Sequence, residues 1–309
     1  MVMIGSQALN ILKQDLKGEI YSVHSNYSFY CLFASGQLLL FHEDIYGIIP
    51  FGIAIPGLRH FLVDKKLEKG MGVVCHDLQF YVSEINLLIS LEKRETLPNR
   101  KKESNEFALE AGILSNLNIA TEFLMEKGSK EGLGGLLYIL NDLLAGSVEG
   151  DKIKALNPFC KSCYKQLICL FAGMAENNYQ NMKKSLDGLL GLGIGLTPSM
   201  DDLLVGFLCT LCYIRKNMSY TLNGLDTLQA LVLSLSHLKT SLISATFLKC
   251  AAQGESYTII DNVIQTILHS SFQNDSNSSF NQLLAVGNNS GKEIFLGIIL
   301  ALRLIFKPC

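Results

Sequence analysis

The sequence predicts an α+β protein in which a small β-rich domain precedes a mainly helical domain. Short strand-like runs separated by glycine or proline fill residues 18–91, and from Phe107 onward the apolar period becomes that of helices. Residues 91–106 between them are polar and contain a proline, which is typical of a domain junction. We therefore expect a β-barrel or sandwich-like domain at residues 1–95 and a helical domain at residues 107–309.

The composition narrows the classes of function. Of the 309 residues, 49% are apolar and 17% are charged, and the net charge is −2. So low a fraction of charged residues predicts that other subunits, or a second copy of this chain, cover part of the surface. The balance of charges argues against nucleic-acid binding, and the one basic cluster, residues 100–102, has acids on both sides and is interpreted as a solvated linker.

No apolar stretch reaches the roughly 18 uncharged residues that a membrane span needs. The N-terminal stretch MVMIGSQALNILKQ lacks the basic region of a signal peptide. We therefore expect a cytoplasmic protein that has no membrane partner.

Strand-like runs in the first domain alternate with turn residues. The stretch GEIYSVHSNYSFYCLFASGQLLLF, residues 18–41, holds two aromatic and β-branched runs interrupted at SGQ, which predicts a hairpin. Residues 46–55 and 70–82 add further short strands with glycine or proline between them. This regular spacing favours a small barrel or sandwich.

Eight stretches with helical period follow the junction. Their apolar residues recur at i, i+3, i+4 and i+7. The stretches are residues 107–127, 134–146, 158–176, 177–191, 191–206, 227–253, 257–272 and 292–306. Residues 271–282, SFQNDSNSSFNQ, are rich in serine and asparagine and predict a polar loop.

The stretch GLGIGLTPSMDDLLVG, residues 191–206, combines a glycine-rich loop with a helix start. Thr197 is a good N-cap, and Pro198 suits the first helical position. The free N–H groups of such a loop, at the positive end of a helix, favour a bound carboxylate or phosphate. A tight, well-capped turn between helices is the alternative. The loop glycines, which allow backbone angles closed to other residues, are Gly191, Gly193 and Gly195.

Two adjacent acids, Asp201 and Asp202, open the helix after this loop. Neighbouring helix residues point about 100° apart, so the two carboxylates face different partners. One can complete a capping box with Ser199, and the other is then free for the amide or ammonium group of a ligand, or for magnesium. We predict both as catalytic residues and expect no cofactor, with magnesium left open. Backbone N–H groups that bind an anion would then lie beside a carboxylate that binds an N–H group. Such a site suits a substrate that carries both an anionic group and an N–H group.

Other polar segments of the sequence could reach the same pocket. Thr240, Ser241 and Ser244 place hydroxyls on an otherwise apolar helix, where the alternative is a bond back to the preceding turn. In the turn VGNNSGKEIFLG, residues 286–297, Ser290 is a plausible N-cap, and a plain Asn/Gly loop is the alternative. The remaining predicted substrate-binding residues are Asn288, Gly291, His24 and Ser25.

Cysteines offer a metal site as an alternative. Cys160, Cys163 and Cys169 could bind zinc, but zinc knuckles usually carry a second pair at suitable spacing. The nearest pair, Cys209 and Cys212, lies in an apolar run where the i, i+3 spacing puts both thiols on one buried helix face. We therefore predict reduced core cysteines and no metal site.

The stretch GLGIGLTPSMDD resembles the signature of the bacterial domain-of-unknown-function family typified by AllH (YlbF), roughly G-x-G-x-G-L-T-P-S-G-D-D-x-L-x-G. Met200 stands where that family has glycine, and we expect this difference to narrow the loop mouth or alter substrate fit. Further similarity lies at residues 23–25, 240–248 and 287–293, so the resemblance spans roughly residues 20–305.

The resemblance implies a function. AllH-like proteins are implicated as one of three subunits of oxamate carbamoyltransferase in allantoin breakdown, which interconverts oxalurate plus phosphate with oxamate plus carbamoyl phosphate. By this resemblance the chain is such a subunit, active in a complex or as an oligomer, and its substrate is a small anion of this kind. The alternative is a non-catalytic regulatory or scaffold subunit that binds a small anion.

Overall fold

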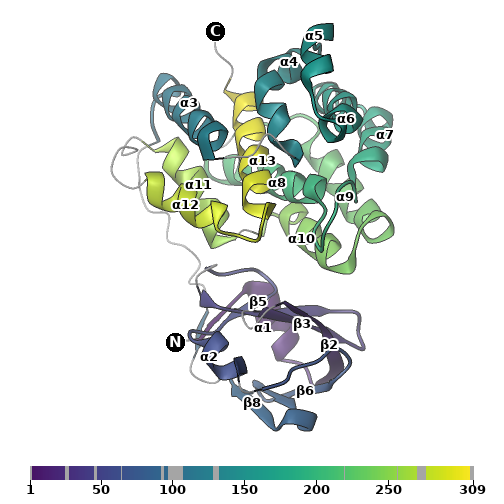
Figure 1. Ribbon diagram of the computed structural model, residues 1–309, viewed down its shortest axis with the longest axis vertical. Coiled ribbons are helices and arrows are strands. Elements are labelled where there is room, and N and C mark those ends of the chain that lie inside the picture. The colour runs from purple at the N-terminus through teal and green to yellow at the C-terminus, as the bar shows by residue number, and fades with distance from the viewer. Residues whose placement is uncertain are drawn as a thin grey trace. The chain divides into compact units, whose positions relative to one another are not determined.

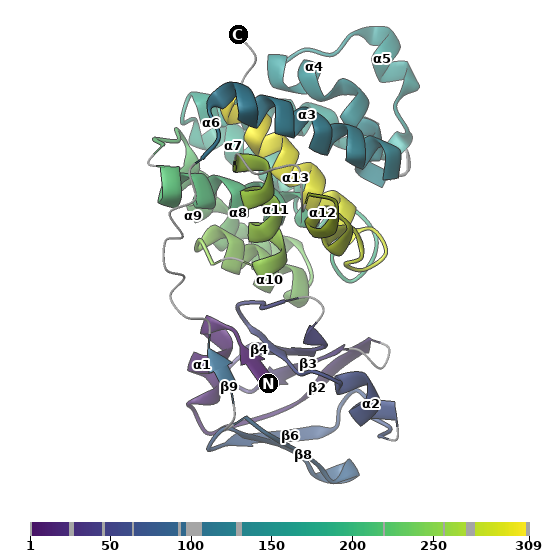
Figure 2. The same cartoon turned by 90° about the vertical axis from the view of Figure 1, so that its left-hand side faces the viewer.

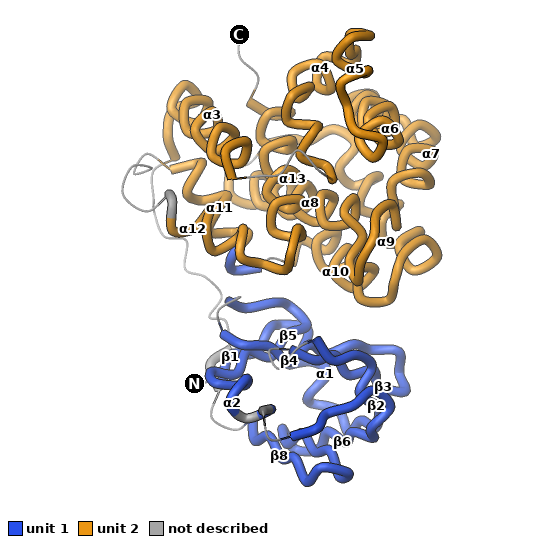
Figure 3. Tube along the Cα trace, viewed as in Figure 1, with its two compact units in different colours: residues 1–104, 257–259 blue, residues 105–256, 260–309 orange. Residues whose placement is uncertain are grey.

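The computed structural model describes residues 2–24, 28–44, 47–63, 65–91, 94–96, 107–127, 132–218, 220–255, 257–269 and 276–306. The chain divides into two compact units (Figure 3). Unit 1 is Met1–Ser104 with Tyr257–Ile259, and unit 2 is Asn105–Ser256 with Ile260–Cys309. A strand-rich unit followed by a mostly helical one confirms the predicted α+β class. The predicted boundaries at residues 95 and 107 stay a prediction, because residues 97–106 lie outside the described part.

Unit 1 holds one curled sheet and short helices (Figure 1). The sheet curls as an open half-barrel, and its strands are β1 (Val2–Ile4), β2 (Leu16–His24), β3 (Ser28–Phe33), β4 (Leu38–His42), β5 (Gly52–Ala54), β6 (Gly72–His76), β7 (Gln79–Val82), β8 (Leu87–Ser90) and β9 (Arg94–Thr96). The helices are α1 (Ser6–Leu12), α2 (Leu58–Val63) and the 3-10 helix η3 (Ser83–Ile85).

Within the described residues the strand order is β8-β7-β6-β2-β3-β4-β5-β1-β9. The pairs β4–β5 and β1–β9 are parallel, and the other pairs are antiparallel. The predicted hairpin at SGQ is confirmed as β3–β4, with Gly36 at a φ of 79° in the turn. The run before it contains two strands rather than one, because β2 and β3 pair antiparallel with His24 opposite Ser28.

The core of unit 1 lies between the curled sheet and its two α-helices. Phe29 and Phe41 stack with ring centroids 4.7 Å apart, and Phe41 and Phe80 lie 4.4 Å apart. Apolar residues of α1 and α2, among them Ala8 and Leu62, belong to the same buried cluster. Burial of these rings and aliphatic side chains away from water is the main stabilising contribution to this unit.

Helices form unit 2 (Figures 1 and 2). They are α3 (Glu110–Lys127), the 3-10 helix η4 (Gly132–Ile139), α4 (Leu140–Ala145), α5 (Gly150–Ala155), α6 (Pro158–Ala175), α7 (Tyr179–Leu189), α8 (Ser199–Met218), α9 (Leu225–Lys239), α10 (Leu242–Ala252), α11 (Thr258–Leu268), α12 (Ser276–Leu284) and α13 (Ser290–Ile305). Two of them, α8 and α13, are buried on nearly all sides, as expected of helices at the centre of a helical protein.

Three predictions about helices need correction. Residues 227–253 form two helices, because Thr240 is extended and the Ser241 hydroxyl caps α10 by accepting the Ser244 N–H at 3.1 Å. Residues 276–282 of the predicted polar loop begin α12, whereas residues 271–275 lie outside the described part. The first half of the stretch 134–146 is a 3-10 helix.

No helix among the described residues is long and apolar enough to cross a membrane.

Candidate functional site

Glycines let the two central helices of unit 2 touch along their backbones. A Cβ atom on Gly206 of α8 would lie 2.1 Å from the carbonyl oxygen of Ile294, and one on Gly297 of α13 would lie 2.0 Å from that of Leu203. Only glycine allows such an approach. The close crossing brings together the first turns of α8 and α13, which carry the polar residues described next.

Asp201 is fully buried at the start of α8 and accepts hydrogen bonds from three segments. The Gly191 N–H donates to its Oδ1 at 2.8 Å, and the Ser244 hydroxyl donates to its Oδ2 at 2.7 Å. The Thr240 hydroxyl also donates to Oδ2. Asp201 therefore joins the start of the glycine loop, the end of α9 and the first turn of α10.

Asp202 faces the other way, toward α13. Its Oδ2 accepts the Thr197 hydroxyl at 3.0 Å, and Ser290 also hydrogen-bonds to this carboxylate. The hydroxyls of Thr197 and Ser290 lie 3.2 Å apart. Asp202 is 5% exposed. The two acids therefore face different partners, as predicted from their positions on the helix.

A third buried acid, Glu293 of α13, lies beside this pair. Its carboxylate hydrogen-bonds to Ser199, the first residue of α8, and it is 6% exposed. A Cβ on Gly132 would lie 3.6 Å from its Oε1, so this glycine borders the carboxylate. We call Asp201, Asp202 and Glu293 the acid cluster.

Burial raises the pKa of all three acids, because an apolar interior disfavours the charged form. For Asp202, burial and the charges of Glu293 and Asp201 raise the pKa to about 7, against the hydrogen bonds from Ser290 and Thr197. No basic side chain hydrogen-bonds to Asp201 or Asp202 among the described residues. A carboxyl group with a pKa near 7 is suited to exchanging protons at neutral pH.

The glycine loop lies against the start of α8. Its three predicted glycines all have positive φ, and a Cβ on Gly193 would lie 2.4 Å from the Ser199 nitrogen. Within the described part of the chain, the structure shows no acceptor for the N–H groups of Gly193, Ile194 and Gly195. Ile194 is 92% exposed, so this edge of the loop faces solvent. The Gly191 N–H, in contrast, is already bound to Asp201.

The predicted capping interactions are wrong in detail, because the hydroxyls bind the acid cluster instead. Thr197 donates to Asp202, while the Pro198 carbonyl accepts the N–H groups of Asp201 and Asp202. Ser199 bonds to Glu293 in place of the predicted capping box. Ser290 is not the N-cap of α13, since Asn289 holds that position.

The structure brings most of the predicted site residues together around the acid cluster of unit 2. Asn288 is exposed and makes no hydrogen bond to the acid cluster within the described residues, and Gly291 packs against the Leu283 carbonyl, where a Cβ would lie 1.9 Å away. His24 belongs to β2 of unit 1, where its ring contacts Ser22, and Ser25 lies outside the described residues. The residues in contact around the acid cluster are Gly191, Gly193, Thr197, Ser199, Asp201, Asp202, Thr240, Ser244 and Ser290.

Met200 does not narrow a loop mouth. Its side chain is completely buried, and its N–H donates to the Leu192 carbonyl at 3.0 Å. The residue where the sequence departs from the family signature therefore fills the interior beneath the loop.

Glu293 was expected only as an acid of the turn that resembles the family, and Gly132, Gly206 and Gly297 were not predicted as site residues. Gly206 is the last glycine of the resembled signature, and its spacing of four residues from Asp202 puts it on the same helix face, so this signal was present. Gly132 carries no such pattern, because only the fold places it beside Glu293.

The cysteines of α6 each donate to a different carbonyl. Cys160 donates to Gly132, Cys163 to Cys160 and Cys169 to Asn181. Burial raises the pKa of Cys163 to about 12, which opposes the thiolate form that zinc needs. No group of three or more His, Cys, Asp or Glu side chains among the described residues is arranged to hold a metal ion.

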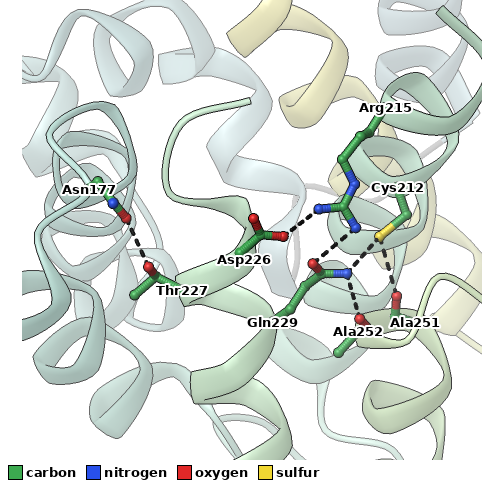
Figure 4. A network of polar contacts seen from close by, with 8 residues as sticks. All are labelled: Asn177, Cys212, Arg215, Asp226, Thr227, Gln229, Ala251 and Ala252. Atoms are coloured by element: carbon green, nitrogen blue, oxygen red, sulfur yellow. Dashed lines mark hydrogen bonds and ion pairs between the residues drawn. The ribbon is translucent and has the colours of Figure 1, made fainter. Parts of the chain in front are cut away.

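A second polar network ties the far end of α8 to α9 and α10 (Figure 4). Arg215 donates to Asp226 at 2.6 Å and to Gln229 at 3.1 Å, and Gln229 donates to Cys212 at 3.3 Å and to the Ala252 carbonyl at 2.6 Å. The network occupies the polar groups at these helix ends, so we interpret it as structural.

Comparison with known families gives a match over one segment of the chain. No solved structure matches the chain. The family model described as oxamate carbamoyltransferase subunit AllH matches residues 189–302, which contain the glycine loop and the acid cluster. Over these residues the chain is therefore a match to the AllH family, as the glycine loop and the paired acids predicted.

Proposed function

We propose that the chain is a cytoplasmic subunit of an oxamate carbamoyltransferase-like enzyme and that Asp202 and Glu293 of its acid cluster contact the substrate. The observation that supports this is the convergence of three buried acids and the glycine loop within the segment that matches AllH. Oxamate and oxalurate each carry a carboxylate and amide N–H groups, so they need both an anion site and a hydrogen-bond acceptor.

In this proposal the loop and the acids take different ends of the substrate. The N–H groups of Gly193, Ile194 and Gly195, at the N-terminus of α8, bind the carboxylate or a phosphate. Asp202 and Glu293 accept from the amide end. Thr197 and Ser290 hold the Asp202 carboxylate in place.

Asp202 also serves as the proton donor and acceptor of the transfer. When a phosphate oxygen attacks the carbamoyl carbon of oxalurate, the C–N bond breaks and the leaving nitrogen of oxamate takes a proton. A carboxyl group with a pKa of about 7 can supply that proton and can take it back in the reverse direction. Magnesium is one variable of the experiment.

The test uses the full chain together with the products of its adjacent genes. We expect the complex to form carbamoyl phosphate from oxalurate and phosphate, and Asp202→Asn to lower kcat by about 10²–10⁴-fold. Asp226→Asn, which changes an exposed acid in the first turn of α9, is the matched control and should keep full activity. The assay is run with and without magnesium.

Two results would contradict the proposal. Full activity of the Asp202→Asn complex would remove the acid cluster from the chemistry. Equal turnover by a complex that lacks this chain would favour the regulatory or scaffold role, and binding of oxamate to the chain by calorimetry would then show whether it still senses the anion.

A further inference from the structure

The two adjacent acids differ in what surrounds them, and this difference assigns them different roles. We infer that Asp201 is a positioning residue that fixes the glycine loop on the α9–α10 junction and does not contact the substrate. This inference rests on the proposed function, in which the glycine loop binds the anion. The contacts of Asp201 that support it all lie within unit 2.

Asp201 has its acceptors occupied by the protein. Both oxygens are engaged, Oδ1 by the Gly191 N–H and Oδ2 by the hydroxyls of Thr240 and Ser244. The side chain is completely buried. A carboxylate in this state offers a ligand neither an exposed oxygen nor an easy exchange of partners.

The same junction holds the loop at both ends. At the start of the loop, a Cβ on Gly191 would lie 2.2 Å from the Lys239 carbonyl oxygen, so the backbone rests directly on the end of α9. At the far end, the Ser241 hydroxyl donates to the Leu196 carbonyl at 2.8 Å. Asp201 binds the loop and the junction at once, so it fixes where the N–H groups between these two ends point.

Asp202 provides the internal comparison. It is adjacent in sequence and equally deep, but its partners are Thr197 and Ser290, and it shares none of them with Asp201. Asn at position 201 keeps the size of the side chain but replaces one acceptor oxygen with a donor. Asp201→Asn should therefore change the position of the loop, whereas Asp202→Asn should change the contact with the substrate.

The first experiment measures amide hydrogen exchange at Gly191 in the full chain. The structure gives this N–H one acceptor, the Asp201 carboxylate, so its protection reports the contact directly. We expect Asp201→Asn to speed exchange about tenfold, because a neutral amide oxygen replaces the charged carboxylate as acceptor and a hydrogen bond to a charged group is stronger by about that factor. Asp202→Asn should leave it unchanged. The Leu190 N–H, which donates to the Leu186 carbonyl, is the control amide in every variant.

The second experiment separates KM from kcat in the reconstituted complex. We expect Asp201→Asn to raise KM for oxamate about tenfold with a smaller change in kcat, and Asp202→Asn to lower kcat. Thr240→Val and Ser244→Ala, which keep the carboxylate, should raise KM in the same direction. Thr240→Ser, which keeps the hydroxyl, should restore the wild-type value.

Several outcomes would overturn the inference. One is loss of turnover in Asp201→Asn with Gly191 protection intact. Another is wild-type KM in Thr240→Val and Ser244→Ala while Asp201→Asn is inactive. If Asp201→Asn does not fold, the KM values of Thr240→Val and Ser244→Ala decide whether the inference holds. If the wild-type complex shows no carbamoyl transfer, the proposed function fails, and the exchange experiment alone decides the role of Asp201.

Discussion

At the scale of single residues, Asp202 is a buried carboxyl group whose pKa is raised into the neutral range. Burial raises its pKa to about 7, and the neighbouring charges of Glu293 and Asp201 act in the same direction. Its folded pKa thus lies above the unfolded value of 3.8, and the folded protein binds the proton more tightly. The stability of unit 2 should therefore fall as pH rises from about 4 to about 7 and be level above that range.

Substitution of Asp202 tests this pH dependence. Between pH 5 and pH 8 we expect the wild type to lose roughly 1–3 kcal/mol of unfolding free energy through this group, since one pKa unit corresponds to about 1.4 kcal/mol. In Asp202→Asn this loss should be absent. Urea unfolding at both pH values measures it, with Asp226→Asn as an exposed control that retains the wild-type slope. An unchanged slope in Asp202→Asn would assign the pH dependence to another group.

The sequence predicted which residues come together in unit 2 better than which residues they bind. The angle between neighbouring helix positions was enough to predict that Asp201 and Asp202 face different partners. Two of these partners lie far along the chain, because Thr240 follows Asp201 by 39 residues and Ser290 follows Asp202 by 88. Local pattern contains no information about such pairs. Thr197 and Ser290 were therefore interpreted as caps, whereas the fold offers their hydroxyls a nearby carboxylate.

At the scale of elements, the crossing of α8 and α13 determines whether the acid cluster exists. We expect Gly206→Ala to destabilise the protein by roughly 2–3 kcal/mol, because its methyl group would meet the Ile294 carbonyl rather than a flexible side chain. Gly188→Ala in α7 is the matched control. Its methyl group would meet only the Gln166 side chain, at 3.4 Å, and should stabilise the helix by about 0.5–1 kcal/mol. Equal unfolding midpoints for the two variants in urea would contradict this role of Gly206.

Element boundaries show where the sequence signal ends. The apolar period of residues 227–253 continues through the α9–α10 break, so periodicity predicted one helix. The break depends on the Ser241 hydroxyl, which caps α10, and on the Thr240 hydroxyl, which binds Asp201. Serine and threonine are tolerated inside helices as well as at their ends, so only the tertiary partner decides between the two.

At the scale of the whole molecule, two compact units with their own cores should respond separately to a local change. The sequence has no tryptophan, so single tryptophans can report each unit. We expect Gly206→Ala to lower the fluorescence transition of Tyr138→Trp in unit 2 and leave that of Tyr81→Trp in unit 1 unchanged. Both parent positions are partly exposed and tolerate the larger ring. Equal shifts at the two reporters would show that the units unfold as one.

The two-part organisation was readable from the sequence, but the strand order was not. The change of period near Phe107 predicted a β-rich part before a helical part. The strand order depends on pairs such as β1 with β5 and β9, which join residues about 50 and 90 positions apart. Such pairing depends on the folding of the whole sheet, and the short runs contain no signal for it.

The interior position of Met200 has an evolutionary consequence. Its thioether occupies space under the loop that no ligand reaches, since the side chain is fully buried. We therefore expect packing to absorb a change at this position and the loop proposed to bind the ligand to keep its surface. Proteins with glycine there should compensate with a bulkier residue nearby, because an unfilled void of that size is costly. An exchange at both positions together, between homologues, would then be a change in packing beneath the loop.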